Sequence, residues 1–121
     1  MSHQNHHAKK HHTKVIKDHG ESMFHEYPIV FEHHSTGTAH INARFPAIGF
    51  AKENEVDQSL YVENGVGVAY VRDTEFPLEP GDVLSIPRKT PYWIVGEELK
   101  LVVVSSPPWF IEQHEVVEII D

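Results

Sequence analysis

The stretch LEPGDVLSIPRKTPYWIV, Leu78 to Val95, decides the fold. Pro80 presets a turn dihedral and Gly81 supplies conformational freedom before Asp82, so "PGD" predicts a tight turn. Short apolar runs follow, and prolines interrupt them at Pro87 and again one residue before Tyr92. The stretch therefore predicts two short buried strands joined by turns, with Tyr92 delivered by the second turn.

From Phe24 onward the rest of the chain has the same pattern of short runs separated by turn residues. β-Branched and aromatic runs are separated by Gly, Pro, Asn or Asp turns at intervals of roughly 8 to 12 residues. The expected strands are residues 23–34, 38–46, 48–52, 58–64, 66–72, 75–78, 82–87, 91–96, 99–106 and 114–120. Asn64 and Gly65 tolerate positive φ and predict a type I′ hairpin. Residues 109–117 admit a helical turn before the last strand.

This many short strands with so little helix must close on themselves or pair as two sheets, because an open sheet would leave exposed edges. A small β-barrel or jelly-roll sandwich satisfies that requirement. The sequence therefore predicts an all-β fold.

Size and composition limit the chain to one domain. The 121 residues are 40% apolar, which is enough for one core. No apolar run of about 18 residues and no signal-peptide pattern occur, so we expect a soluble cytoplasmic protein with no membrane partner. The chain has no cysteine, so His, carboxylates and hydroxyls must carry any chemistry.

The first twenty residues differ from the rest. They hold six of the eleven histidines and almost no apolar periodicity. Such a segment cannot bury a core, so we expect residues 1–20 to form a disordered His-rich tail, or a leader with no specific role. Its imidazoles are expected to bind divalent metals such as Ni²⁺ or Zn²⁺ only adventitiously.

The remaining chain is strongly acidic. Residues 21–121 carry six basic and seventeen acidic side chains. This surface repels phosphate backbones, and the sparse basic tail is too short to reverse that repulsion. Nucleic acid is therefore not an expected partner.

The order of these turns resembles the cupin superfamily, whose second motif runs Gly, five residues, Pro, x, Gly, x, x, His. Gly81 followed by Pro87 matches the opening of that motif, and the resemblance covers Asp57 to Pro107. The closing "PPWFIEQH", Pro107 to His114, is similar to the end of some short single-domain cupins. The resemblance implies a jelly-roll β-barrel over residues 21–121 and a homodimer. Many cupins also hold a divalent metal.

The usual cupin metal ligands are all substituted. The Glu of the first motif falls on Gln58, and its two His ligands fall within "AKEN", residues 51–54. In the second motif the Gly is Lys89 and the His is Tyr92. Amides and phenols are poor ligands for transition metals at neutral pH, so we expect no metal cofactor in the barrel.

Strand alternation then indicates which side chains face the barrel. Side chains two residues apart share a face, so an inward Tyr92 brings Ile94 with it, and an inward Gln58 brings Leu60 and Val62. Arg44, Asn42 and His40 share one face, which the resemblance places inside. The expected ligand-binding residues are Arg44, Gln58, Tyr92, Trp109 and Gln113, with His114 at the rim.

Three functional hypotheses follow. The first is a barrel that binds a small polar molecule, sugar-like or a carboxylate, without metal; Arg44 would favour the carboxylate. The second is a metal-independent isomerase or epimerase of a sugar or small carbonyl compound, with Tyr92 as acid and His114 or His40 as base. The third is a metalloenzyme with noncanonical His ligands. The sequence leaves open whether the protein is an enzyme, and each of these side chains also has a purely structural interpretation.

Overall fold

The computed structural model describes residues 6–18 and 20–118. In this part of the chain the strands are β1 (Lys14–Lys17), β2 (Met23–Glu26), β3 (Ser35–Phe45), β4 (Phe50–Glu53), β5 (Asp57–Val71), β6 (Thr74–Leu78), β7 (Val83–Ile86), β8 (Tyr92–Ser106) and β9 (His114–Val117). Two short 3-10 turns, η2 (Lys10–His12) and η3 (Ile111–Gln113), complete it. The expected all-β fold is confirmed, and η3 lies within the expected helical turn.

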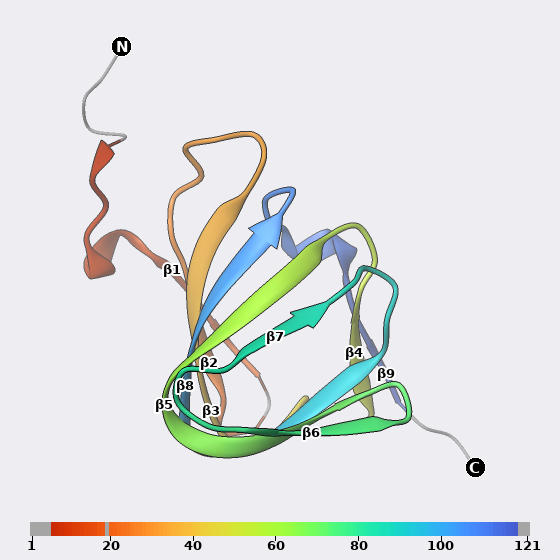
Figure 1. Cartoon of the computed structure of the whole chain (residues 1–121). Helices are drawn as coiled ribbons and strands as arrows, with labels where there is room; N and C mark the ends of the chain where they lie inside the picture. The colour runs from red at the N-terminus through yellow and green to blue at the C-terminus, as the bar shows by residue number, and fades with distance from the viewer. Residues whose placement is uncertain (1–5, 19, 119–121) are drawn as a thin grey trace.

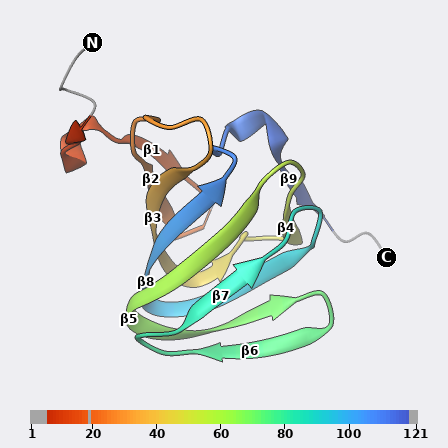
Figure 2. The same ribbon diagram turned by 45° about the horizontal axis from the view of Figure 1, so that its top comes forward.

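The strands form one curled antiparallel sheet (Figures 1 and 2). Its main path runs β1-β2-β3-β8-β4-β9, and β5 pairs with β6, β7 and β8. Strands β5 and β8 pair along nearly their whole length, so they bend and serve both halves of the barrel. The edge strands of the main path, β1 and β9, each have only four residues.

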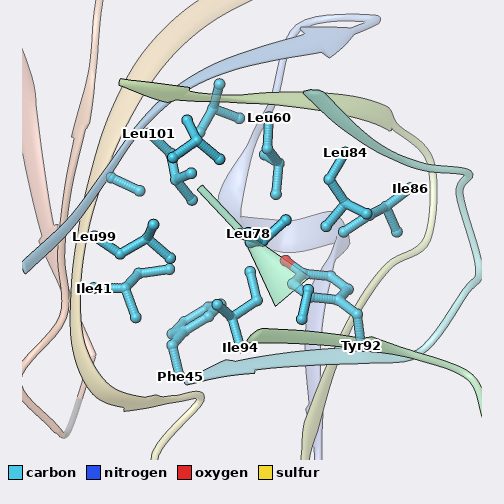
Figure 3. Close-up of a cluster of buried hydrophobic side chains, with 14 of the residues drawn as sticks. Ile41, Phe45, Leu60, Leu78, Leu84, Ile86, Tyr92, Ile94, Leu99 and Leu101 are labelled. Carbon is cyan, nitrogen blue, oxygen red and sulfur yellow. The ribbon is translucent and has the colours of Figure 1, made fainter. Parts of the chain in front are cut away.

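Alternation along the strands fills one part of the barrel with a hydrocarbon core. Leu60 and Val62 of β5, Leu84 of β7, and Ile94 and Leu101 of β8 are all buried. Figure 3 shows Leu60, Leu84, Ile94 and Leu101 converging, with the phenol oxygen of Tyr92 pointing into the same interior. The expected inward phase of Leu60, Val62 and Ile94 is therefore confirmed. Burial of apolar area at about 25 cal/mol per Å² holds the sheet closed.

The prediction that residues 1–20 form a disordered tail was wrong for residues 14–17. Lys14–Lys17, expected in the mobile tail, form β1 and pair with Met23–Glu26. The short Lys-rich sequence lacks the apolar alternation that predicts a strand, because β1 is an exposed edge strand that needs few apolar residues. Residues 1–5 and 19, including His3 and His19, lie outside the described residues. In the described part, no helix is long and apolar enough to cross a membrane.

The hairpin predicted at Asn64 and Gly65 was also wrong. Strand β5 continues through both residues, with register shifts against β8 on either side of Asn64. Gly65 has a φ of +82°, so the positive φ that predicts a turn serves a bulge here. The hairpin instead joins β5 to β6, where Val71 pairs with Thr74 and Arg72 has a φ of +53°.

We expect Gly65→Ala to lower the free energy of unfolding by roughly 2 to 4 kcal/mol. A Cβ at this position would overlap the backbone carbonyl of Glu98, in addition to the strain of a positive φ. Gly81→Ala is the matched control, because Gly81 has a φ of +98° and nothing within 4 Å of the added carbon. Its expected loss is about 1 kcal/mol. Urea denaturation of both variants measures the difference, and equal losses would contradict the steric account.

Candidate functional site

The part of the barrel that the hydrocarbon core leaves open is a cavity of about 230 Å³. Aromatic side chains of Phe24, Phe45 and Trp109 form much of its wall. The polar lining consists of Lys17, Asp18, Glu26, Glu53, Gln58, Tyr92 and His114. An apolar wall with a few convergent polar groups is typical of small-molecule sites.

The cavity is organised around Glu53, the last residue of β4. Its side chain is 3% exposed, and Ala51, two residues earlier, shares its inward face. Oε2 accepts hydrogen bonds from the Tyr92 hydroxyl at 2.6 Å and from His114 Nδ1 at 2.8 Å. Oε1 accepts from Trp109 Nε1 at 2.9 Å and from Gln113 Nε2 at 2.7 Å. Four side-chain donors therefore converge on one buried carboxylate.

These donors keep Glu53 ionised. Burial alone would raise its pKa, but the hydrogen bond and charge of His114, with hydrogen bonds from Tyr92 and Gln113, lower the pKa below its usual value. Tyr92 responds in the opposite sense, since burial and the adjacent Glu53 charge raise the pKa of its phenol well above the usual value. Tyr92 is therefore a fixed hydrogen-bond donor to Glu53, and a poor candidate for the proton-donating acid.

His114 is oriented by this carboxylate. An ionised carboxylate only accepts hydrogen bonds, so the contact at 2.8 Å places a proton on Nδ1. The ring stacks on Phe45, with centroids 6.3 Å apart, and its side chain is 17% exposed. In a neutral ring Nε2 then carries the lone pair. This pattern of a base oriented by a buried carboxylate is found in many hydrolytic triads.

The segment from Trp109 through η3 positions the remaining donors. Gln113 is 2% exposed; its amide nitrogen donates to Glu53, and its amide oxygen accepts the backbone N–H of Glu55 at 3.1 Å. The backbone N–H of Trp109 donates to Ser35 Oγ at 3.0 Å, which fixes the start of the closing segment. Gln113 thus ties the start of β9 to β4, and the backbone of Trp109 ties the segment before η3 to β3.

Gln58 also lies inside, on β5. It is 8% exposed, lines the cavity, and donates through Nε2 to Ser105 Oγ at 3.1 Å. The structure therefore brings Gln58, Tyr92, Trp109, Gln113 and His114 to one end of the barrel. Whether each contacts a ligand stays a prediction.

The inward positions expected for Arg44 and His40 were wrong. The two residues do share a face of β3, but Ala39, Ile41 and Phe45 occupy the inner one. The Arg44 guanidinium lies 4.1 Å over the Trp93 ring and donates to the Pro46 carbonyl on the outer surface. His40 is 41% exposed and contacts Glu98 at 3.2 Å.

Two carboxylates were missed. Glu53 falls in the "AKEN" segment, where it was noted only as a lost histidine position. Glu26 belongs to the expected strand 23–34 and shares the phase of Phe24, which lines the cavity. Burial raises the pKa of Glu26 to about 7, and the nearby charge of Glu53 contributes to the rise. The alternation of "MFHE" was the available signal for Glu26.

The residues at the cupin metal position do not fit a divalent cation. Both oxygens of Glu53 already accept hydrogen bonds from two side-chain donors each, a set that surrounds an anion. A metal ion at this carboxylate would have to displace those donors. In residues 6–18 and 20–118, no three His, Asp or Glu side chains gather as a metal-holding group.

Comparisons with solved structures identify the fold. Pac13 from Streptomyces, a nucleoside dehydratase in complex with uridine, has a TM-score of 0.80 at 17% identity, over 93% of this chain and 90% of its own. KdgF from Halomonas sp. has a TM-score of 0.70 at 16% identity, over 86% and 94%. An RmlC-like cupin from Desulfovibrio desulfuricans has a TM-score of 0.58 at 21% identity, over 71% and 82%.

Two further comparisons, with protein-family models and with curated protein sequences, found no match. The structural likeness extends over nearly the whole chain, and the curled antiparallel sheet accounts for it. The expectation drawn from the "PGD" turn and the spacing of Gly81 and Pro87 is confirmed: this protein has the cupin fold.

Proposed function

We propose that the protein is a metal-independent enzyme that transfers protons on a small, uncharged, hydroxylated compound in the barrel cavity, by isomerisation, epimerisation or loss of water. The observation that carries the proposal is the pairing of His114 with Glu53 inside the cavity, at 2.8 Å. A carboxylate that fixes the imidazole tautomer leaves Nε2 as a general base. His114 takes the base role, and His40 is excluded by its position on the outer face.

The charges of the cavity favour an uncharged ligand. Its wall carries Asp18, Glu26 and Glu53 against one lysine, Lys17. Arg44, which would have paired with a carboxylate or phosphate, lies outside. A second negative charge in this low-dielectric space is repelled by the ionised Glu53. Of the two expected ligand classes, sugar-like and carboxylate, these charges therefore favour the neutral sugar-like one.

The size and walls of the cavity agree with such a ligand. A volume of about 230 Å³ is smaller than the range of roughly 300 to 1,000 Å³ typical of drug-sized ligands. Phe45 and Trp109 offer aromatic surface against which a ring can pack. Pac13, the similar structure named above, is a nucleoside dehydratase and was solved with uridine, which supports this class of ligand. The homodimer and the cytoplasmic location stay predictions.

The test compares neutral compounds with their phosphates. Thermal unfolding is recorded with uridine and D-xylose, and with uridine 5′-phosphate and xylose 5-phosphate. A neutral compound is expected to bind at least ten times more tightly than its phosphate, and saturation at about 100 Kd stabilises the fold by about 2.7 kcal/mol. Equal or tighter binding of a phosphate, or no shift with either neutral compound, would contradict the proposal.

Proton transfer is tested in heavy water. NMR of the bound compound follows exchange of carbon-bound hydrogen for deuterium, or loss of water. His114→Gln keeps a donor toward Glu53 while it removes the base, and the rate is expected to fall at least 100-fold. His40→Gln, on the outer face, is the matched control and should leave the rate unchanged. Equal rates in wild type and His114→Gln would overturn the base assignment and leave a binding protein without turnover.

A further inference from the structure

The Glu26 carboxyl group lies against Gly37, a strand residue that has no side chain. On the sheet, Glu26 of β2 pairs with Gly37 of β3. A Cβ built on Gly37 would lie 2.8 Å from Glu26 Oε2 and 3.2 Å from its carboxyl carbon. A side chain at position 37 would therefore crowd the Glu26 carboxyl where it lies over β3, and it would press still closer, at 2.7 Å, on the backbone carbonyl oxygen of His25. A glycine inside a strand is weakening by itself, so its presence indicates a close approach.

The surroundings of this carboxyl leave it without a fixed partner. It lines the same cavity as Glu53, and no hydrogen bond to it is present within residues 6–18 and 20–118. The charged and titratable groups that face it are Lys14 on β1, which pairs with it across the sheet, and, around the cavity, Lys17, Asp18, Glu53, Tyr92 and His114. Asp18 is occupied by the backbone N–H of Ala47 at 2.9 Å. Glu26 is thus a carboxyl group in the cavity whose hydrogen-bonding capacity remains available to a ligand.

We propose that Glu26 is the second proton-transfer group of the cavity, the acid that complements His114, and that Gly37 is the positioning residue that seats it. This inference rests on the proposed function for its chemistry, and on the β2 and β3 geometry for its placement. The two carboxylates then have different roles. Glu53 is fixed by four donors and orients the base, whereas Glu26 exchanges its proton with the ligand.

The proton balance is complete for each reaction class. In loss of water, His114 Nε2 takes a proton from carbon, and the C–H electron pair forms a new C=C bond. The neighbouring C–O bond breaks, and its oxygen leaves with the proton of Glu26 as water. Solvent then returns a proton to Glu26 and removes one from His114.

In isomerisation, the same acid protonates the carbonyl oxygen while the base takes the neighbouring carbon-bound proton, which gives an enediol. His114 then gives its proton to the former carbonyl carbon, and Glu26 takes the proton of the other hydroxyl group, so the carbonyl moves by one carbon. In epimerisation, solvent protonates the original carbon of the enediol from the opposite face, Glu26 takes back its proton from oxygen, and His114 releases its proton to solvent.

The titration of Glu26 supports this role. Burial, together with the Glu53 charge, raises its pKa to about 7, so the carboxyl is partly protonated near neutral pH. An acid whose pKa lies close to the working pH is the most effective proton donor. The exchange rate is therefore expected to fall as the pH rises above about 7, because the donor form is lost.

The positioning of Glu26 by Gly37 is tested in the free protein, without any ligand. Carbon-13 NMR of the glutamate carboxyl groups gives the titration midpoint of Glu26 in wild type, Gly37→Ala and Gly67→Ala. A Cβ at Gly37 would meet the His25 carbonyl oxygen at 2.7 Å in addition to Glu26, and one at Gly67 would meet the Val95 carbonyl oxygen at 2.6 Å. The two variants thus impose similar backbone contacts, and only the first crowds the carboxyl.

We expect Gly37→Ala to move the Glu26 midpoint downward by at least one pH unit, because the displaced carboxyl turns toward solvent, while Gly67→Ala leaves it near the wild-type value. If Gly37→Ala does not fold, because the added Cβ also meets the His25 carbonyl oxygen, Glu26→Asp gives the second measurement. Its shorter side chain withdraws the carboxyl from Gly37, so the titration midpoint at position 26 should fall toward the ordinary value of an aspartate. A midpoint in Gly37→Ala equal to that of wild type, or a midpoint in Glu26→Asp that stays near 7, would overturn the positioning role of Gly37.

The acid role has its own readout. In the exchange assay, Glu26→Gln is expected to lower the rate at least 100-fold and to remove the fall in rate above pH 7, with binding of the neutral compound retained. A rate and pH profile like those of wild type would overturn it. If His114→Gln leaves the exchange rate unchanged, the proposed function is refuted. If Gly37→Ala leaves the titration midpoint of Glu26 unchanged, the positioning role of Gly37 is refuted. The two failures are therefore distinguishable.

Discussion

Glu53→Ala is expected to lower the free energy of unfolding by about 3 to 5 kcal/mol at pH 7.5. The substitution leaves Tyr92, Trp109, Gln113 and His114 without their common acceptor in a buried space. A buried donor that loses its partner costs the free energy of its desolvation, and four such donors lose it together. Urea denaturation followed by circular dichroism measures the loss.

Glu98→Ala is the control for removing a carboxylate. Glu98 also accepts side-chain hydrogen bonds, from Asn42 and His40, but its side chain is 71% exposed. Water replaces those partners, so the expected loss is small. A Glu53→Ala loss as small as that of Glu98→Ala would contradict the description of Glu53 as the centre of a buried network.

Glu26→Gln is expected to stabilise the protein at pH 8, by about 1 to 2 kcal/mol after allowance for partial solvent exposure. The folded-state pKa of Glu26, about 7, lies above the ordinary value of 4.5. Between these two values the folded chain holds a proton that the unfolded chain has released. The Glu26 contribution to stability is therefore fully present below about pH 4.5 and is lost as the pH rises to about 7.

The measurement is the free energy of unfolding at half-unit pH steps from 4 to 8 (roughly the window set by the linkage). Wild type should lose stability relative to Glu26→Gln across this window, and the two curves should run parallel above it. Glu53 contributes with the opposite sign, because its lowered pKa gives stability that is lost on acidification. Parallel curves throughout would contradict the burial of an ionisable Glu26.

A group that weakens the fold at neutral pH calls for a functional reason. Replacing Glu26 by a neutral side chain removes the cost of burying a charge near Glu53, and Gly37 adds a further weakness to β3. Natural chains commonly carry such costs at active sites, where activity requires a strained or destabilised arrangement. The Glu26 and Gly37 pair is a costly local arrangement of this kind, which the proposed acid role explains.

The sequence predicted the fold from local chemistry. The turn at Pro80 to Asp82 and the alternation through Gln58, Leu60 and Val62 both depend on neighbouring residues, and both were right. Gly65 shows the limit of such reasoning, since positive φ serves a hairpin turn and a bulge equally well. Only the partner strand, β8, distinguishes them.

The candidate site depends on contacts that sequence does not show. Glu53 and His114 are 61 residues apart, and their hydrogen bond exists because β4 pairs with β9. Arg44 was assigned to the wrong face of β3, because alternation fixes which residues share a face and leaves open which face is inside. Phe45, the bulky apolar neighbour of Arg44, takes the inner face. The resemblance to metal-binding cupins predicts only that ligand positions are lost in residues 51–54, and it gives no role to the carboxylate of Glu53 that stands there.

The pairing of His114 with Glu53 supports the whole functional account, and nitrogen-15 NMR of the His114 ring tests it most directly. In wild type at pH 8 we expect a proton on Nδ1, a scalar or through-space connection of that proton to Glu53, and an unprotonated Nε2 whose signal moves when a neutral ligand binds. In Glu53→Gln the preference for this tautomer should be lost. A proton on Nε2 in the wild type, with Nδ1 bare, would contradict the account.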